Sequence, residues 1–121
     1  MRILIVEDDL DVAEMISECL QIEADVAVRI VGDAAAALNA CPEFRPDVIL
    51  LDLGLPDVSG SKITAQLMTF CPTARIIILS GYDPGRDGDR PPPEFVRLIK
   101  PVDFDVLHHH VFAAGIGRLQ A

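Results

Sequence analysis

Apolar residues follow two alternating patterns along this chain, namely short unbroken runs and longer stretches with helical spacing. The runs Val48–Leu51 and Ile76–Leu79 contain no polar residue, which is typical of central strands covered on both faces. In Leu10–Ile22, by contrast, apolar residues recur every three or four positions, which predicts a helix with one buried face. In chain order the patterns predict strands at Ile3–Val6, Val26–Ile30, Val48–Leu51, Ile76–Leu79 and Val96–Ile99, and helices at Leu10–Ile22, Ala34 to about Ala40, Ser59–Phe70 and Asp103 to about Ala114.

Regular alternation of strand and helix with short links predicts one doubly wound α/β domain over residues 1–121. Such a domain has a parallel sheet, right-handed crossovers and helices on both faces of the sheet. Arg29 interrupts the second strand, which we therefore expect at an edge of the sheet. In these folds the ligand site lies outside the carboxyl ends of the strands, near the point where the strand order reverses.

The predicted helices carry capping signals at their starts. Asp8 or Asp9 can cap the first helix and Asp33 the second, which we expect to stop at Pro42 because proline disrupts a helix interior. The expected core-facing positions are Val12, Met15, Ile16, Cys19 and Leu20 in the first helix, Ile63, Leu67 and Phe70 in the third, and Phe104, Leu107, Val111 and Phe112 in the last.

One segment breaks the alternation. Where a fourth helix is due, residues 81–93 hold four of the nine prolines and three of the eight glycines. Proline and glycine are the poorest helix formers. We therefore predict that a Pro/Gly-rich loop replaces this helix.

Acidic residues outnumber basic ones in the chain. The 19 Asp and Glu residues against 10 Lys and Arg give a formal net charge of −9. This balance argues against direct binding to nucleic acid or to an anionic membrane surface, because both require a basic patch. The apolar runs are too short to cross a bilayer and no secretory signal pattern precedes the first strand, so we expect a cytoplasmic protein.

The three cysteines, Cys19, Cys41 and Cys71, are odd in number and widely spaced. This arrangement matches neither a disulfide framework nor a CxxC metal site. We expect them to act as small buried apolar residues on helices or at helix ends.

Polar residues stand where the predicted strands end. Glu7 and Asp8 follow the first strand, Asp52 the third, Ser80 the fourth and Lys100 the last. Packing does not explain Asp52, because burying an unpaired charge is costly. In a parallel sheet all of these side chains meet at one edge.

These residue types suit the chemistry of phosphate. Crowded carboxylates repel one another unless a cation joins them, and Mg²⁺ held by Glu7, Asp8 and Asp52 would retain open positions for phosphate oxygens. The Lys100 ammonium would add a second positive charge, and the Ser80 hydroxyl could donate to a phosphoryl oxygen. Asp52 is then a carboxylate nucleophile that can form an acyl phosphate.

At these residues the chain resembles the receiver domain of bacterial response regulators. The resemblance rests on Ile5–Asp9, Leu51–Pro56, Leu79–Gly81 and Lys100–Pro101 in this order and spacing, and it extends over almost the whole chain. It implies a five-stranded sheet of order 2-1-3-4-5. It also implies Mg²⁺-dependent transfer of a phosphoryl group to Asp52 from the histidine of a kinase or phosphotransfer protein.

The resemblance further assigns roles to single residues. Glu7 and Asp8 match the acidic metal pair of the family, and Gly54 would offer its backbone carbonyl to the metal. Ser80 matches the switch hydroxyl. Lys100 matches the lysine of the family, whose bond to the following proline is usually cis.

Two departures from the family pattern stand out. Arg97 lies three positions before Lys100, where the family usually has an aromatic residue, and the fourth helix is lost, as in an atypical receiver subgroup. They leave a second interpretation open, a pseudo-receiver that binds partners without phosphorylation.

An aspartyl phosphatase of the haloacid-dehalogenase type would need a second aspartate where Gly54 stands. The consecutive His108–His110 would point in different directions on a helix and do not predict a metal site.

The resemblance implies a signalling regulator rather than a classical enzyme. The expected partners are a histidine kinase or phosphotransfer protein upstream and another protein downstream. A second copy of the chain is an alternative route of output, because 121 residues leave no room for an effector domain.

Overall fold

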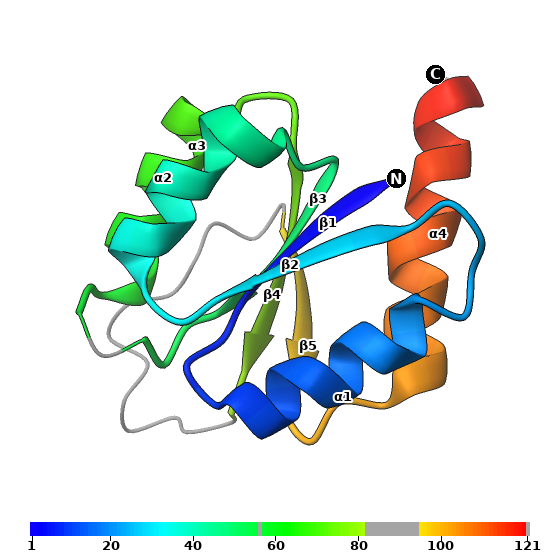
Figure 1. Cartoon of the computed structure of the whole chain (residues 1–121), viewed down its shortest axis with the longest axis horizontal. Helices are drawn as coiled ribbons and strands as arrows, with labels where there is room; N and C mark the ends of the chain where they lie inside the picture. Colours follow the sequence, from blue (N-terminus) through cyan, green and yellow to red (C-terminus); the bar gives the residue numbers. More distant parts are fainter. Residues whose placement is uncertain (56, 82–94, 121) are drawn as a thin grey trace.

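Five parallel strands form one sheet in the order β2-β1-β3-β4-β5 (Figure 1). The computed structural model describes residues 1–55, 57–81 and 95–120, with side chains through residue 112. The sheet and its order confirm the sequence prediction, including the edge position of the strand that contains Arg29. The strands are β1 (Arg2–Val6), β2 (Ala27–Val31), β3 (Val48–Asp52), β4 (Arg75–Ser80) and β5 (Val96–Ile99).

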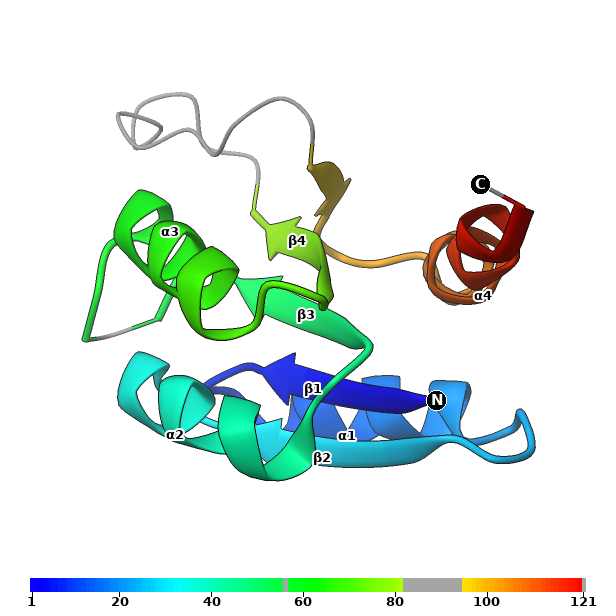
Figure 2. The same ribbon diagram turned by 90° about the horizontal axis from the view of Figure 1, so that it is seen from above.

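Helices cover both faces of the sheet, with α2 and α3 on one face and α1 and α4 on the other (Figure 2). This arrangement is the doubly wound architecture that strand–helix alternation predicts. The described residues hold four helices, in agreement with a receiver-like fold that lacks the fourth helix. The helices are α1 (Leu10–Leu20), α2 (Ala34–Phe44), α3 (Gly60–Phe70) and α4 (Phe104–Gln120).

The core consists of two apolar layers separated by the sheet. Alternate residues of β1 supply both layers: Ile3 and Ile5 pack with α1 and α4, whereas Leu4 and Val6 pack with α2 and α3. Every residue of β3 is buried, as expected for the central strand. Burial of each large aliphatic side chain contributes about 1.5–3 kcal/mol, so these two layers dominate the stability of the fold.

The expected caps are present at the starts of α1 and α2. Asp9 Oδ1 accepts hydrogen bonds from the backbone N–H groups of Asp11 and Val12 at 3.1 and 3.3 Å. Asp33 Oδ1 accepts from the Ala36 N–H at 2.7 Å. Each cap satisfies backbone donors that have no partner within the helix.

The prediction that Pro42 ends the second helix is wrong, because α2 continues through Pro42 to Phe44. A proline removes one backbone donor from the helix, and here the loss is outweighed by packing, since Cys41 and Phe44 both contact the core layer beneath α2. The helix ends when Arg45 adopts a left-handed conformation with φ of 52°.

Three apolar residues that were expected to face the core are exposed instead. Met15 is 55% exposed, Phe70 is 58% exposed and Phe104 is 37% exposed, although Ile16, Ile63, Leu67, Leu107 and Val111 on the same helices are buried as predicted. The spacing of apolar residues along a helix defines an apolar face, and the sheet covers only part of that face.

Cys41 and Cys71 form a disulfide, which corrects the expectation of unpaired cysteines. Cys41 lies in the last turns of α2 and Cys71 directly follows α3, and their Cα atoms are 5.8 Å apart. Their spacing of 30 residues gave no signal for pairing. The two cysteines meet because α2 and α3 both run antiparallel to the strands and end beside each other at the end of the sheet where the strands begin. Cys19 is a free thiol.

The predicted loop at residues 81–93 lies, apart from Gly81, outside the described residues. Within residues 1–55, 57–81 and 95–120, no helix combines the length and apolar character needed to cross a bilayer.

Candidate functional site

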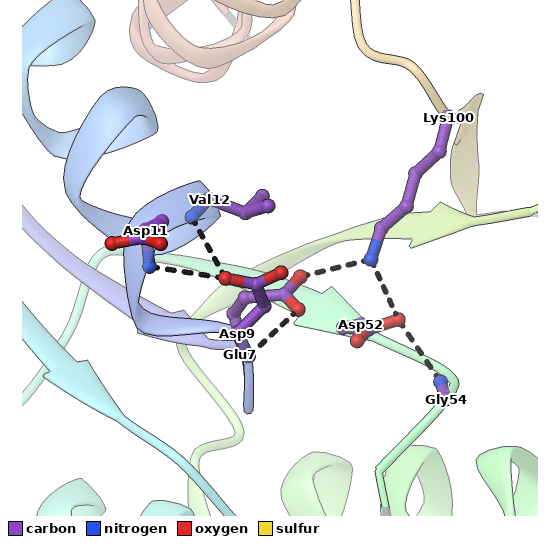
Figure 3. A network of polar contacts seen from close by, with 7 residues as sticks. All are labelled: Glu7, Asp9, Asp11, Val12, Asp52, Gly54 and Lys100. Carbon is purple, nitrogen blue, oxygen red and sulfur yellow. Dashed lines mark hydrogen bonds and ion pairs between the residues drawn. The ribbon is translucent and has the colours of Figure 1, made fainter.

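The carboxyl ends of four strands bring the predicted site residues to one edge of the sheet. Figure 3 shows Glu7, Asp52 and Lys100 at this edge. Glu7 directly follows β1, Asp52 is the last residue of β3, Ser80 is the last residue of β4, and Lys100 directly follows β5. The strand register aligns them, because Asp52 pairs with Leu79 and Ser80 pairs with Ile99. Glu7, Asp52 and Ser80 are 2%, 5% and 5% exposed.

The Lys100 ammonium group joins the two buried carboxylates. Its Nζ lies 2.9 Å from Glu7 Oε2 and 3.2 Å from Asp52 Oδ1 (Figure 3). The peptide bond between Lys100 and Pro101 is cis, as the family resemblance implies. One ammonium between two carboxylates, with Asp8 beside them, leaves the group with an excess of negative charge.

The pKa of Glu7 is raised above its ordinary value of 4.5. Burial of the carboxylate is the largest cause, and the nearby charge of Asp52 raises the pKa further. The hydrogen bond from Lys100 and the one from the Asp9 N–H oppose this shift without reversing it. The ionised form of Glu7 is therefore not fully compensated by the protein alone.

The pKa of Lys100 is raised above its ordinary value of 10.5, although burial, the largest single effect, acts to lower it. The hydrogen bond with Glu7 and the charges of Asp52 and Glu7 together outweigh burial. Lys100 is consequently held in its charged form at neutral pH.

Carboxylate oxygens of Glu7, Asp8 and Asp52 all lie within 4.8 Å of one another, which fits the ligand set of a hard divalent cation. The uncompensated charge of Glu7 also favours a cation here. Gly54 lies directly beside the Asp52 carboxylate, since a Cβ at that position would lie 3.4 Å from Asp52 Oδ1, at van der Waals contact. The Gly54 N–H donates to the same oxygen at 3.0 Å, which fixes the orientation of the Asp52 carboxylate.

Sequence reasoning missed the immediate partner of Ser80. The Arg97 Nε donates a hydrogen bond to Ser80 Oγ at 2.8 Å. Arg97 stood out in the sequence only as a departure from the family pattern, and the contact becomes visible when the register of β4 and β5 is known.

Sequence reasoning also missed Asp57. Its carboxylate accepts hydrogen bonds from the backbone N–H groups of Ala34 and Ala35 at 3.1–3.4 Å. The connection after β3 is thereby joined to the start of α2, where an acid is favoured by the helix dipole.

The histidines of α4 lie away from this edge. His108 Nε2 lies 2.8 Å from Glu23 Oε1, and its ring packs on Phe112 at a centroid distance of 4.5 Å. Among the described residues, the group that could hold a metal is the acidic one at Glu7, Asp8 and Asp52, so the histidines contribute no ligand cluster there.

Comparison with known proteins places this site in a family context. The family model described as the response regulator receiver domain matches residues 3–90. A DNA-binding response regulator, MtrA of Mycolicibacterium paratuberculosis, is 38% identical over 96 residues that include 71% of this chain. The chain spans only 42% of the length of that relative.

Solved structures show the same fold over nearly the whole chain. The signal receiver domain of a modulated diguanylate cyclase from Desulfovibrio desulfuricans superposes with a TM-score of 0.79 at 27% identity, covering 99% of this chain and 98% of the other. A two-component transcriptional regulator, AraC, from Clostridium phytofermentans gives a TM-score of 0.83 at 21% identity, covering 99% and 95%.

Proposed function

The chain belongs to the family of response regulator receiver domains, and we propose that it accepts a phosphoryl group on Asp52 in a Mg²⁺-dependent reaction. The observation that carries this proposal is the contact of the Lys100 ammonium with both Glu7 and Asp52 beside a third carboxylate, Asp8. This combination supplies a nucleophile, a cation and an oxygen ligand set at one sheet edge.

In the proposed reaction an oxygen of Asp52 attacks the phosphorus of a phosphohistidine on the donor protein. A P–O bond forms, the P–N bond breaks, and the imidazole leaves with the electron pair of that bond and is protonated. The product is an acyl phosphate on Asp52. The hydrogen bond from the Gly54 N–H to Oδ1 leaves Oδ2 as the oxygen that is not held by this donor.

The metal is proposed to be held by Glu7, Asp8 and Asp52, with the backbone carbonyl of Gly54 as a further ligand. A bound Mg²⁺ supplies positive charge that offsets the carboxylates and the phosphoryl oxygens. The residues themselves position the reactants and neutralise charge, which is most of what phosphoryl transfer requires.

Lys100 and Ser80 are proposed to stabilise the product. The ammonium already contacts Asp52 Oδ1 and is in place to pair with a phosphoryl oxygen once Asp52 is phosphorylated. The Ser80 hydroxyl, at the end of the neighbouring strand, can donate a hydrogen bond to the same group.

Receiver domains act as signalling regulators rather than as classical enzymes, and the partners of this chain are proposed accordingly. The upstream partner is a histidine kinase or a phosphotransfer protein, and the downstream partner is another protein or a second copy of the chain. Direct contact with nucleic acid is not proposed, because the chain carries a net charge of −9.

Incubation with a small phosphodonor such as acetyl phosphate, followed by intact mass measurement, tests the proposal. We expect a single phosphoryl adduct that requires Mg²⁺ and is absent from Asp52→Asn. An adduct that persists in Asp52→Asn would move the acceptor to another residue. Absence of any adduct on the wild-type chain would instead support the pseudo-receiver.

A further inference from the structure

The Arg97 side chain lies on the same face of the sheet as Ser80. In β5, Arg97 pairs with Ile78, and Ser80 is two residues beyond Ile78 on β4. Side chains alternate along a strand, so Arg97 and Ser80 share a face, while Val96 and Leu98 pack on the opposite layer with α1 and α4. The position of Arg97 on β5 thus directs its guanidinium toward the end of β4.

The contact fixes what the Ser80 hydroxyl can do. A hydroxyl has one donor hydrogen and two acceptor lone pairs, whereas a guanidinium offers only donors. Since Arg97 Nε donates to Ser80 Oγ at 2.8 Å, it occupies one lone pair and forces the hydroxyl hydrogen to point elsewhere. Ser80 is 5% exposed, which limits the water that could compete for that hydrogen.

We propose that Arg97 is a positioning residue that holds Ser80 as a hydrogen-bond donor to the phosphoryl group on Asp52. This inference rests on the proposed function. The positive guanidinium also polarises the hydroxyl, which makes it a stronger hydrogen-bond donor. The catalytic contact belongs to Ser80, and Arg97 acts through it.

Two other roles for Arg97 make different predictions. As a simple long-range charge it would attract the phosphoryl group whether or not Ser80 is present. As a purely structural link it would hold β5 against β4 and affect unfolding without changing phosphoryl uptake. A double-mutant cycle on Arg97 and Ser80 separates all three roles.

The experiment measures the rate of phosphoryl uptake from acetyl phosphate with Mg²⁺ in Arg97→Met, Ser80→Ala and the double variant. Methionine preserves much of the length of the side chain but lacks its donors and charge. We expect each single variant to be slower by about tenfold, which corresponds to the loss of one charge-assisted hydrogen bond, and the double variant to be no slower than Ser80→Ala alone. Arg97→Lys, which retains the charge and a donor, is expected to lie between wild type and Arg97→Met.

Arg29→Met is the matched control, because Arg29 lies on β2, the edge strand opposite β5, where it pairs with Glu43 of α2. It should take up phosphoryl groups at the wild-type rate. If Arg97→Met does not fold, Arg97→Lys in the wild-type and Ser80→Ala backgrounds provides the same comparison.

An equal slowing by Arg97→Met with and without Ser80 would overturn the inference, as would a rate within about twofold of wild type in Arg97→Met. These results differ from failure of the proposed function, in which the wild-type chain itself forms no adduct.

Discussion

The two ends of the sheet are held together by different kinds of interaction. At the end where the strands begin, a disulfide joins Cys41 to Cys71, and the Asp47 carboxylate accepts a hydrogen bond from the Arg2 N–H at 2.8 Å. At the end where the strands finish, Lys100 is shared by carboxylates that it does not fully neutralise. The first end stabilises the domain, whereas the second keeps a chemical site whose charges are left for a ligand to balance.

Reduction of the disulfide is expected to have the largest effect on the first end. Closing a loop of 30 residues stabilises a fold by about 3 to 4 kcal/mol through the entropy of the unfolded chain. Urea unfolding of the oxidised and the reduced, alkylated protein should show this difference in the free energy of unfolding. Phosphoryl uptake should be unaffected under conditions where both forms are folded. A reduced protein that is equally stable would contradict the assignment of a stabilising role.

Lys100→Met tests the second end and is expected to have the next largest effect. Removing a preorganised positive charge from a phosphoryl site slows transfer by about a hundredfold. The measurement is the rate of adduct formation with acetyl phosphate and Mg²⁺. Lys62→Met, at the exposed Lys62 on α3, is the matched control and should behave as wild type. Equal rates of adduct formation in Lys100→Met and Lys62→Met would show that Lys100 has no role in phosphoryl transfer.

Asp57→Ala probes a contact that lies near the site in sequence but acts on the fold. Loss of a carboxylate that accepts from the Ala34 and Ala35 N–H groups is expected to cost about 1 kcal/mol in the free energy of unfolding. Asp33→Ala removes the N-cap side chain of the same helix and provides a reference, because it is expected to lower the free energy of unfolding by a similar amount. Unchanged stability in Asp57→Ala alone would show that the contact contributes nothing.

Glu7→Gln is expected to have the smallest effect on stability. The effect should be a gain in metal-free stability, whereas reduction of the disulfide at the other end of the sheet should cause a loss. The raised pKa means that Glu7 binds its proton more tightly in the folded protein than in the unfolded chain. Its contribution to stability is therefore present below pH 4.5 and is lost as the pH rises through the raised folded pKa. At neutral pH the variant should be slightly more stable than wild type without metal, yet bind Mg²⁺ more weakly. Thermal unfolding with and without Mg²⁺ measures both; lower metal-free stability would contradict the prediction.

Most of the fold could be predicted because the central strands are short apolar runs and the helices have apolar residues at helical spacing. Val48–Leu51 has no polar residue and lies at the centre of the sheet, and Asp9 and Asp33 cap helices as their positions indicated. Phe70 was misplaced because helical spacing cannot show where the covered part of a face ends.

The site residues could also be grouped from the sequence, since four of the five predicted strands are directly followed by a polar residue. Their detailed contacts could not be predicted, because these depend on register and on the meeting of distant segments. The bond from Arg97 to Ser80 requires the alignment of β4 with β5, and the pairing of Cys41 with Cys71 requires the relative placement of two helix ends.

The anchoring of Asp57 on α2 has a consequence for the tolerance of insertions and deletions. The connection between β3 and α3 is fixed at one end by the contacts of Asp52 and at the other by Asp57, so a change in its length would displace one anchor or the other. In the exposed connection between Leu20 and Ala27, the described side chains make one contact with a distant element, that of the exposed Glu23 with His108. Extra residues, such as a short tag or a reporter, are therefore expected to be accepted far more readily after α1 than after β3.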